Sequence, residues 1–509
     1  MKKASKILCL LLGLLMLAGA FAACGSEPKP NTDVTTAANG GDEGATTGGE
    51  EETTVDLSEK DDLAASYDFG GATYRILSRE STAYEFSPNE DISGGLVSEQ
   101  INRRNESVKE RANVEIEIIT TPGDWSADKI AAFQTRIRTN AMNGVSEYDL
   151  IASHSAYIMD SAITGGVAWD FSKIPGVNVT KKWWSKAFYE ECNYNGAIYM
   201  MYGDIAYTLY EYIEVVFFNQ TMANNYPDIE DLYDLALEGE WTWEKMKEYT
   251  LKITSDPDAG DMQNFGLLSN AHFERALPNA LGMQYLEKGY DGTYSFPAAL
   301  DGESDRILTD IADFYNNNEG VHTRLTTNTD DGYLNPIFSS GRALFYGQTL
   351  NQSAAFRASM KDKYGVLPLP KLNEAQLEYR VATRDTMTGV MIPYNVENIE
   401  RTGVVTELLC MESRKSVVES YYSTVLQKRT FDDERCKATL DLIRNSVVLS
   451  FQQAYSYTLN YPNSLMTSIL GTQGAQSPSS VYAGQQTTWN TKIIKMFETL
   501  DATALKQSD

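Results

Sequence analysis

Histidine is scarce in this sequence, and the positions of the few histidines exclude the commonest metal centres. Only His154, His272 and His322 occur, and none has the short spacing to a second histidine or a cysteine that zinc sites use. A GxSxG nucleophile motif, a P-loop and a GxGxxG turn after a strand are also missing. We therefore expect no metal, no cofactor and no catalytic residue of a standard kind.

Cysteine is nearly as rare, and its spacing excludes a disulfide framework. Cys9 and Cys24 belong to the N-terminal stretch, so that only Cys192, Cys410 and Cys436 remain in the folded part. Three widely separated cysteines make neither a CxxC metal site nor a set of bridges. We expect buried free thiols, with a bridge between Cys410 and Cys436 as the alternative.

Positive charge is short as well: 43 lysines and arginines face 70 acidic residues, giving a net charge of −27. Without a basic stripe to neutralise phosphates, nucleic acid is excluded as a partner. Acidic substrates are disfavoured, whereas an uncharged ligand such as a carbohydrate fits. Abundant carboxylates leave open an acid pair for glycoside hydrolysis, although most of them are typical of a solvated surface.

The N-terminal stretch has the pattern of a secretory signal. Three lysines precede an apolar run at 7–17 that is too short to span a membrane comfortably, and small residues at 18–23 lead to Cys24. The residues before Cys24 resemble a bacterial lipobox, with Phe21 where leucine is usual. We therefore predict a signal peptide at 1–23 and lipidation of Cys24, which anchors the protein to the outer face of the cell membrane. Ordinary secretion is the alternative.

Residues 24–66 contain almost no large apolar side chain. After Cys24 they hold eleven acidic residues and two lysines among threonine, glycine and alanine. Such a segment cannot bury enough surface to offset the entropy of ordering it. We predict an extended, disordered tether.

The remaining residues are too many for one hydrophobic core, which favours two lobes. At their start, short apolar runs alternate with helical spacing, a pattern that predicts strands at 74–77, 114–119 and 148–151 with helices at 95–112 and 126–143 between them. Such alternation indicates an α/β protein with right-handed parallel βαβ units. Loops at the carboxyl ends of these strands are expected to face the functional crevice.

Polar residues follow two of these strands. Arg79 and Glu80 come after the first strand, and His154 and Tyr157 come after the third. A polar side chain at such a position favours a role in binding, with loop solvation as the alternative.

The stretch 338–370 adds an order of elements that can be compared with known families. Gly341 is predicted to end a helix that contains Phe338, and the apolar run after this glycine is typical of a buried strand. Pro368 and Pro370 end a second predicted strand. Together with a hairpin at 194–199, an apolar strand at 215–220 and a capped helix start at 241–246, this order resembles family 1 extracellular solute-binding proteins. Members of that family are the receptors of ABC importers.

The resemblance implies a two-lobe, periplasmic-binding-protein-like fold of type II with a helix-rich C-terminal lobe. Its crossing strands are expected near residues 205–214, 343–348 and 386–392. The N-terminal lobe is expected at 67–207 with 345–390, and the C-terminal lobe at 208–344 with 391–509.

The function that the resemblance implies is binding and not catalysis. We expect a monomeric lipoprotein receptor that captures a small ligand, an oligosaccharide by preference, in the cleft and delivers it to the ABC permease. A surface glycoside hydrolase and a carbohydrate-adhesion module are the alternatives.

Tyrosines crowd the first expected crossing, and an aromatic face can stack on a sugar ring. Packing of a half-buried strand is the alternative explanation for them. The resemblance places further ligand contacts beside the crossings and at a tryptophan that we expect to open a helix after the loop 471–486. The remaining candidates are Asp204, Tyr207, Tyr212, Gln348, Arg384, Asp385 and Trp489.

Overall fold

The computed structural model describes residues 60–123, 126–253, 263–290, 292–323, 331–423, 426 and 433–506. The predicted signal peptide, Cys24 and most of the tether lie outside these residues. The last tether residues contact the folded part: Asp61 pairs with Arg111 at 2.7 Å, and Leu63 packs against the core. The predicted end of the tether at residue 66 is therefore wrong, because these residues find partners on the folded chain.

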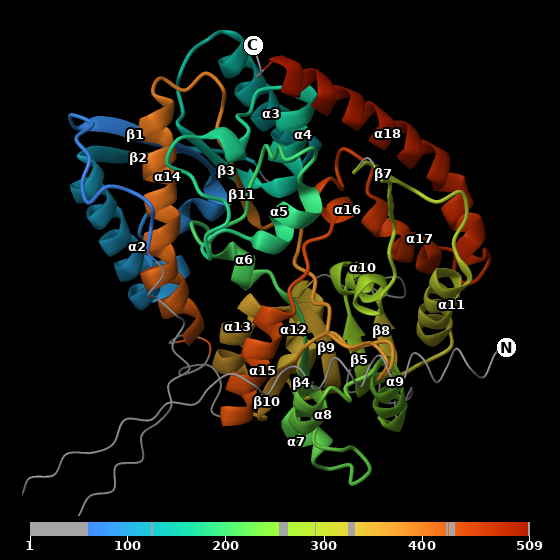
Figure 1. The fold of residues 1–509 in the computed structure, drawn as a ribbon. Coiled ribbons are helices and arrows are strands. Elements are labelled where there is room, and N and C mark those ends of the chain that lie inside the picture. Colours follow the sequence, from blue (N-terminus) through green and yellow to red (C-terminus); the bar gives the residue numbers. More distant parts are fainter. Residues whose placement is uncertain are drawn as a thin grey trace, which may run out of the picture. The chain divides into compact units, whose positions relative to one another are not determined.

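The first sheet has four strands in the order β11-β3-β1-β2 (Figure 1). Strands β1, β2 and β3 run parallel, as the βαβ pattern predicts, whereas β11 is antiparallel to β3. Their bounds are β1 (Ala72–Arg79), β2 (Val114–Thr121), β3 (Leu150–His154) and β11 (Thr388–Met391).

Helices cover this sheet, and one of them comes from late in the chain. Helix α14 packs against α2, where Tyr74 and Thr406 share a hydrogen bond of 2.7 Å and Arg401 pairs with Asp149 at 3.1 Å. Helix α14 continues into a π-helical turn, η5 (Arg414–Val418). The other bounds are η1 (Glu80–Glu85), α2 (Glu90–Ala112), α3 (Ala127–Met142), α4 (Ser155–Gly165), η2 (Phe171–Lys173), α5 (Lys186–Cys192), α14 (Ile399–Ser413) and α16 (Phe451–Ala454).

The second sheet has five strands in the order β10-β4-β9-β5-β8. Strand β4 is antiparallel to both β9 and β10, and β5 is parallel to β8 and β9. Gly341, with φ of 78°, ends the helix before β9, and a Cβ there would lie 2.5 Å from the Asp362 carboxylate. The bounds are β4 (Glu214–Asn219), β5 (Phe265–Ser269), β8 (Val321–Thr323), β9 (Ala343–Thr349) and β10 (Tyr364–Leu367).

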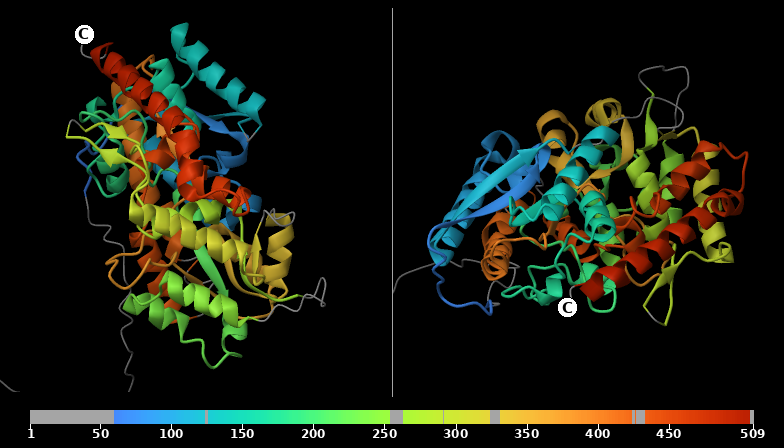
Figure 2. Two further views of the ribbon diagram at one scale, coloured as in Figure 1. Left: turned by 90° about the vertical axis from the view of Figure 1, so that its right-hand side faces the viewer. Right: turned by 90° about the horizontal axis from the view of Figure 1, so that it is seen from above.

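Most remaining helices surround this second sheet, and α18 runs alongside both lobes. Helix α18 contacts α4 of the first lobe and α11 of the second, as the views in Figure 2 show. The bounds are α6 (Thr208–Glu211), α7 (Gln220–Ala223), α8 (Leu232–Glu238), α9 (Trp243–Lys252), α10 (Ala271–Ala280), β6 (Glu287–Lys288), β7 (Tyr294–Ser295), α11 (Gly302–Asn316), α12 (Asp331–Ser339), η4 (Leu350–Gln352), α13 (Ser353–Ser359), α15 (Glu434–Asn445), η7 (Pro462–Ser464), α17 (Leu465–Gly471) and α18 (Pro478–Lys506).

Among the segments that pass between the lobes, 205–214, 379–388 and 445–451 lie side by side. The middle segment bonds to the first through Glu214 N to Ala382 O and Arg384 N to Tyr212 O, both at 2.9 Å. It bonds to the third through an isolated parallel bridge between Val381 and Val447. These segments form a hydrogen-bonded band between the lobes, which are also connected by the chain that runs from α14 on the first lobe to α15 on the second.

This arrangement corrects two parts of the predicted division. Strands β9 and β10, expected to cross or to join the N-terminal lobe, lie inside the second sheet, and the third crossing is at 445–451. Helix α14, expected in the C-terminal lobe, covers the first sheet. A buried apolar strand has the same residue pattern in a sheet interior as at a crossing, and an amphipathic helix does not specify which sheet it covers.

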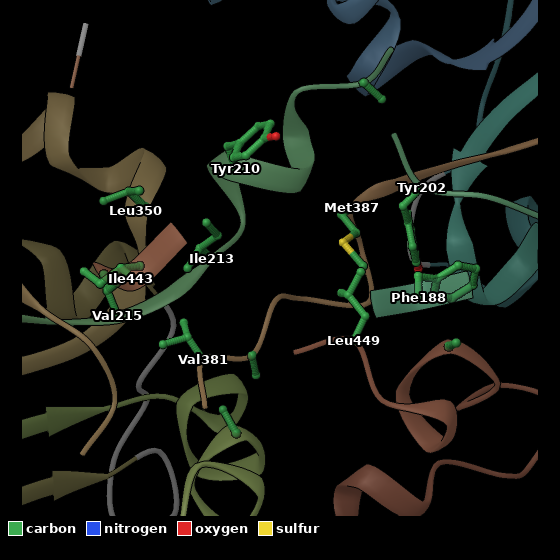
Figure 3. Packing of buried hydrophobic residues seen from close by; sticks show 14 of the residues in the cluster. Phe188, Tyr202, Tyr210, Ile213, Val215, Leu350, Val381, Met387, Ile443 and Leu449 are labelled. Carbon is green, nitrogen blue, oxygen red and sulfur yellow. The ribbon is translucent and has the colours of Figure 1, made fainter. Parts of the chain in front are cut away.

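One continuous cluster of buried hydrophobic residues extends through both lobes and the crossing band. Figure 3 shows Ile213, Val381, Met387 and Leu449 of the crossing segments within it. Cys192, Cys410 and Cys436 are buried free thiols, so the alternative of a bridge between Cys410 and Cys436 is wrong. Burial of the crossing segments makes them part of the core.

Candidate functional site

A cavity opens where the second and third crossing segments meet α10. The space between these elements is about 480 Å³ when open solvent is counted, and about 40 Å³ of it admits the centre of a water-sized sphere. We call it the crossing cavity, and it is lined chiefly by Glu214, residues 382–385, the α10 residues His272, Arg275 and Asn279, Tyr285, residues 450, 452 and 453, and Asn463. The predicted residues Arg384 and Asp385 therefore lie in its wall.

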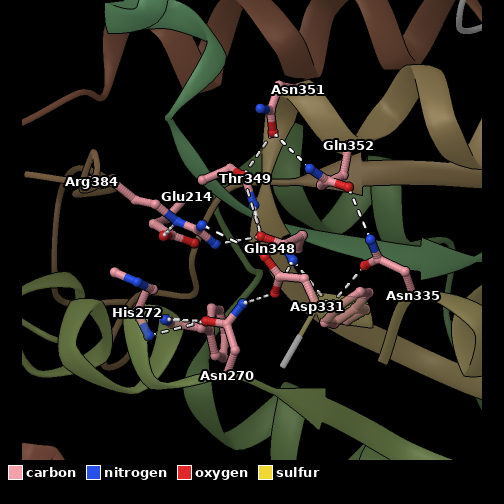
Figure 4. A network of polar contacts seen from close by, with 12 residues as sticks. Glu214, Asn270, His272, Asp331, Asn335, Gln348, Thr349, Asn351, Gln352 and Arg384 are labelled. Carbon is pink, nitrogen blue, oxygen red and sulfur yellow. Dashed lines mark hydrogen bonds and ion pairs between the residues drawn. The ribbon is translucent and has the colours of Figure 1, made fainter. Parts of the chain in front are cut away.

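Arg384 connects this wall to the second sheet. Its Nε donates to Glu214 Oε1 at 2.8 Å, and its Nη2 donates to Gln348 Oε1 (Figure 4). Gln348 Nε2 in turn donates to Asp331 Oδ1 at 2.7 Å. The structure thus brings together two predicted residues, with Gln348 buried behind Arg384 at the end of β9.

The residue that follows β5 orients the cavity face of α10. Asn270 Oδ1 accepts hydrogen bonds from the main-chain N–H groups of His272 and Phe273, both at 3.0 Å, which caps the helix. Gly347 of β9 permits the close approach of α10, because a Cβ there would lie 2.1 Å from the Phe273 ring. These contacts fix where His272 and Arg275 enter the cavity wall.

The strand ends of the first sheet reach the same crossing segment. Arg79 Nη2 donates to Thr386 O at 2.8 Å, and His154 Nδ1 donates to Asp385 O at 3.3 Å. Both predicted side chains are buried, whereas Glu80 is exposed on the first turn of η1. Arg79 and His154 therefore hold the main chain of the cavity wall in place, and their predicted contact with a ligand stays a prediction.

Burial and paired charges determine the electrostatics of the site. Burial raises the pKa of the Glu214 carboxyl, and its ion pair with Arg384 opposes that rise. Burial also raises the pKa of Asp385, which the Arg275 guanidinium opposes. For His154, burial and the charge of Arg79 lower the pKa well below its ordinary value, so its ring is neutral. Each carboxylate of the cavity thus has an arginine beside it.

Several polar atoms of the cavity wall have no hydrogen-bond partner among the described residues. They are Glu214 Oε2, Tyr285 OH, Thr383 Oγ1 and Asn463 Oδ1, all of them buried. An unpaired buried polar group costs about 1–3 kcal/mol. Four such atoms around one cavity are available to bond water or a polar ligand.

A chain of aromatic rings leads from β3 towards the surface. The His154 and Tyr157 centroids are 4.6 Å apart, Tyr157 and Tyr457 are 5.6 Å apart, and Tyr457 and Tyr461 are 5.9 Å apart. Tyr461 is 37% exposed. Burial raises its pKa to about 12, and the nearby Asp385 charge adds to that shift.

Tyr461 is also held in an unusual backbone conformation. Asn460 and Tyr461 are adjacent non-glycine residues with φ of 65° and 56°. Residues in this left-handed region cost free energy, and such strain is concentrated at ligand-binding positions. The partly exposed Tyr461 ring lies two residues before Asn463, which belongs to the cavity wall.

Trp489 does not lie where the sequence prediction put it. Helix α18 begins at Pro478, so Trp489 is inside the helix, fully buried, with ring contacts to Phe296 and Tyr482. Its Nε1 donates to Asn460 O at 3.3 Å. The prediction that Trp489 begins a helix is wrong. Trp489 instead bonds to the main chain of the Asn460–Tyr461 turn from inside α18.

The candidates of the first crossing are directed away from the crossing cavity. Asp204 is buried and pairs with Arg414 at 3.0 Å. Tyr207 packs edge-on against Tyr84 at 5.8 Å. Tyr212 reaches the crossing band through its main-chain oxygen, which accepts from Arg384 N. The surroundings of Tyr207 and Tyr212 therefore agree with the alternative explanation, in which these tyrosines pack within the protein.

Sequence reasoning missed the polar face of α10, the Asn460–Tyr461 turn and Asn463. One signal was present: Tyr455, Tyr457 and Tyr461 lie close together in the sequence, and Pro462 follows them. The α10 residues gave no comparable signal, because their role depends on the capping by Asn270.

Two searches of the described part of the chain complete the description of the site. There, no group of three or more His, Cys, Asp or Glu side chains is arranged to hold a metal ion. No helix among the same residues is long and apolar enough to cross a membrane.

Comparisons with known proteins place the fold. The family described as bacterial extracellular solute-binding protein matches residues 105–403. No curated protein matches the chain. Among solved structures, the extracellular solute-binding protein from Staphylococcus aureus in complex with maltose has a TM-score of 0.54 at 11% identity, covering 84% of this chain and 98% of that one.

Two further structures are similar. The maltose/maltodextrin-binding domain from Bdellovibrio bacteriovorus, bound to maltotriose, has a TM-score of 0.51 at 13% identity and covers 83% of this chain and 100% of its own. An ABC transporter solute-binding protein from Agrobacterium radiobacter K84, in complex with ribitol, has a TM-score of 0.50 at 14% identity and covers 84% and 99%. The predicted two-lobe fold is confirmed.

Proposed function

Because the chain belongs to the bacterial extracellular solute-binding protein family, we propose that it is the receptor of an ABC importer that binds an uncharged polyhydroxylated ligand in the crossing cavity. An oligosaccharide is the preferred ligand. The observation that carries the proposal is the set of four buried, unpaired polar atoms around one cavity.

The chemistry of the wall supports an uncharged ligand. Glu214 and Asp385 each have an arginine next to them, so the wall offers hydrogen-bonding groups without a large excess of one charge. Maltose, maltotriose and ribitol, named with the similar structures, are likewise uncharged and rich in hydroxyl groups. The half-exposed Tyr461 ring supplies a surface on which a sugar ring can stack.

Closure of the two lobes on the ligand is the proposed mode of capture. Three short segments join the lobes, and a few residues in such segments can absorb a rotation between rigid bodies. A ligand shifts the lobes towards closure only through contacts that the closed state improves. The cavity wall contains residues from both lobes and from the band between them, so it offers such contacts.

We propose no catalytic step at this site. Glycoside hydrolysis needs one carboxylic acid and one carboxylate that face the scissile bond. Here Glu214 is committed to Arg384 at 2.8 Å, and the charge of Arg275 acts on Asp385. Mass spectrometry of maltotriose after incubation with the protein should find it intact, whereas maltose and glucose among the products would favour a hydrolase.

A calorimetric screen tests the binding proposal. Maltose, maltotriose and ribitol form one group of ligands, and glycine, glutamate and a dipeptide form the other. We expect binding within the first group, accompanied by a smaller radius of gyration in small-angle scattering. Binding of only the charged group would contradict the proposed ligand class, and binding without compaction would contradict closure.

The proposal includes a lipid anchor at Cys24 and delivery to a permease in the membrane. It rests on the signal-like residues before Cys24 and on the acidic tether after it. The variant Cys24→Ala should appear in the medium, with Cys192→Ala as the control that stays with the membranes. Membrane retention of Cys24→Ala would rule out this anchor.

A further inference from the structure

A cavity larger than the crossing cavity lies at the C-terminal end of α10. The space is about 1110 Å³ when open solvent is counted, and about 450 Å³ of it admits the centre of a water-sized sphere. Pockets that bind small organic molecules commonly have volumes of about 300–1,000 Å³. We call it the α5 cavity, because α5 of the first lobe contributes one wall and the residues that follow α10 in the second lobe contribute another.

The α5 cavity is a neighbour of the crossing cavity but differs from it in charge. Asn279, Tyr285, Ser450 and Gln452 line both cavities. None of the charged residues of the two linings is shared. The α5 cavity is therefore a separate site, which the proposed function does not use.

The wall from the first lobe is acidic. Glu190 and Glu191 lie on α5, and both line the cavity. Glu190 is exposed and pairs with Lys186 at 3.4 Å. Glu191 is only partly exposed, and its main-chain oxygen accepts from Tyr294 OH at 3.0 Å, which fixes the residue beside β7. Glu191 is therefore the better placed of the two acids to bind a ligand cation.

A second wall is basic. Arg380, at the start of the second crossing segment, donates from Nε to both the main-chain and the side-chain oxygen of Asn279 at 3.2 Å. These bonds orient the guanidinium, and no carboxylate of the described residues is paired with it. Lys288 of β6 lies over the Tyr294 ring, 5.1 Å from its centroid. A guanidinium held in this way can bind a carboxylate through its two terminal nitrogens.

Apolar side chains and one hydroxyl complete the lining. Met283, Leu286 and Leu449 are buried at the cavity wall. The Tyr285 hydroxyl is also buried and has no hydrogen-bond partner among the described residues. The cavity thus combines an acid, a base and an apolar surface.

We propose that the α5 cavity binds a zwitterionic α-amino acid with an apolar side chain, such as leucine. Arg380 holds its carboxylate, Glu191 holds its ammonium group, and its side chain packs on Met283, Leu286 and Leu449. A ligand with a single charge matches one charged wall and is repelled by the other. Because α5 belongs to the first lobe and the residues after α10 belong to the second, the bound amino acid contacts both lobes.

Calorimetry with three probes of one carbon skeleton tests the proposal. Leucine carries both charges, isocaproate lacks the amine, and isopentylamine lacks the carboxylate. We expect leucine to bind at least about tenfold more tightly than either analogue, since each analogue loses one hydrogen bond between charged groups. Glycine should also bind more weakly than leucine, because it has no side chain to cover the apolar wall.

Two variants locate the bound leucine. Arg380→Met should weaken leucine binding by about tenfold or more, whereas Arg103→Met, at an exposed position on α2, is the matched control and should bind like the wild type. Glu191→Gln is nearly isosteric at a partly exposed position, so its melting temperature should be that of the wild type. It should lose the preference for leucine over isocaproate and keep the preference over isopentylamine.

Three results would overturn the proposal. They are a wild type that does not bind leucine, equal affinities for leucine and its two analogues, and leucine binding that neither Arg380→Met nor Glu191→Gln changes. No sugar is added in these experiments, so their outcome is independent of the ligand of the crossing cavity.

Discussion

The acidic clasp, a hydrogen-bonded cluster of Tyr84, Glu85, Thr208, Glu211 and Thr388, and the crossing cavity both include polar side chains of the crossing segments, but they differ in how fully those side chains are paired. In the clasp, both carboxylate oxygens of Glu85 accept hydrogen bonds, and Thr208 and Thr388 bond to each other. In the cavity, Glu214 Oε2 and Thr383 Oγ1 have no partner among the described residues. A paired cluster stabilises the fold, whereas unpaired polar atoms are left to bond water or a ligand.

The comparison also separates two acids of the first crossing segment, Glu211 and Glu214. Glu214 has a direct ion pair with Arg384 and carries its charge at the cavity wall. The Glu211 side chain is part-buried and accepts a hydrogen bond from the Tyr84 hydroxyl at 2.6 Å. Both acids lie within the first crossing segment, so one buried ion pair and one part-buried carboxyl occur close together in the same segment.

The largest predicted effect is on stability, at the ion pair of the cavity wall. Arg384→Met should lower the free energy of unfolding by about 3–5 kcal/mol, because it leaves the Glu214 carboxylate buried without its partner. Urea unfolding measures the change. The double variant Arg384→Met with Glu214→Gln should regain most of it, since no buried charge remains unpaired.

Arg435→Met is the matched control, because its ion pairs with Asp231 and Asp433 are partly exposed. Its loss should stay within about 1 kcal/mol. Equal losses in the two arginine variants would show that burial does not distinguish the cavity wall from the surface.

The second prediction tests the hydrogen bond between Thr208 and Thr388 in the acidic clasp. Thr208→Val removes the hydroxyl that accepts from Thr388 N at 2.9 Å. Leaving that buried N–H without an acceptor should lower the free energy of unfolding by about 1–3 kcal/mol, measured in urea. A variant as stable as the wild type would mean that the clasp hydrogen bonds add nothing to the fold.

The parts of the fold that depend on local pattern could be predicted from the sequence. The three parallel strands of the first sheet and the helices between them follow from periodicity alone. Arg79 and His154 also lie at the crossing segment, because carboxyl ends of parallel strands meet at one edge. These inferences depend only on the pattern of residues that are close together in the sequence.

The parts that depend on long-range packing could not be predicted. Strand β9 has the residues of a buried strand, and only its pairing with β4 and β5 shows that it does not cross between lobes. Trp489 follows a stretch rich in serine, glutamine and glycine, which conceals that α18 begins at Pro478. For both, the deciding contacts come from segments distant in sequence.

The third prediction concerns ligand affinity and the aromatic edge of the cavity. Tyr461→Ala should weaken binding of the best ligand from the calorimetric screen by about 0.5–1.5 kcal/mol, the usual contribution of an aromatic contact beyond its buried area. Tyr290→Ala, at a fully exposed tyrosine, is the control and should bind like the wild type. Equal affinities for the two variants would place the ligand away from Tyr461.

The smallest predicted effect on stability is at Thr383, the unpaired counterpart of Thr208. Thr383→Val removes a buried hydroxyl that has no partner, so the free energy of unfolding should change by no more than about 0.5 kcal/mol or should rise slightly. The same variant should bind the ligand more weakly in calorimetry, because a methyl group cannot bond to a ligand hydroxyl. Thr208→Val should show the opposite pattern, with lower stability and little change in affinity. If Thr383→Val loses as much stability as Thr208→Val and keeps its affinity, the cavity is part of the folded framework and the ligand site lies elsewhere.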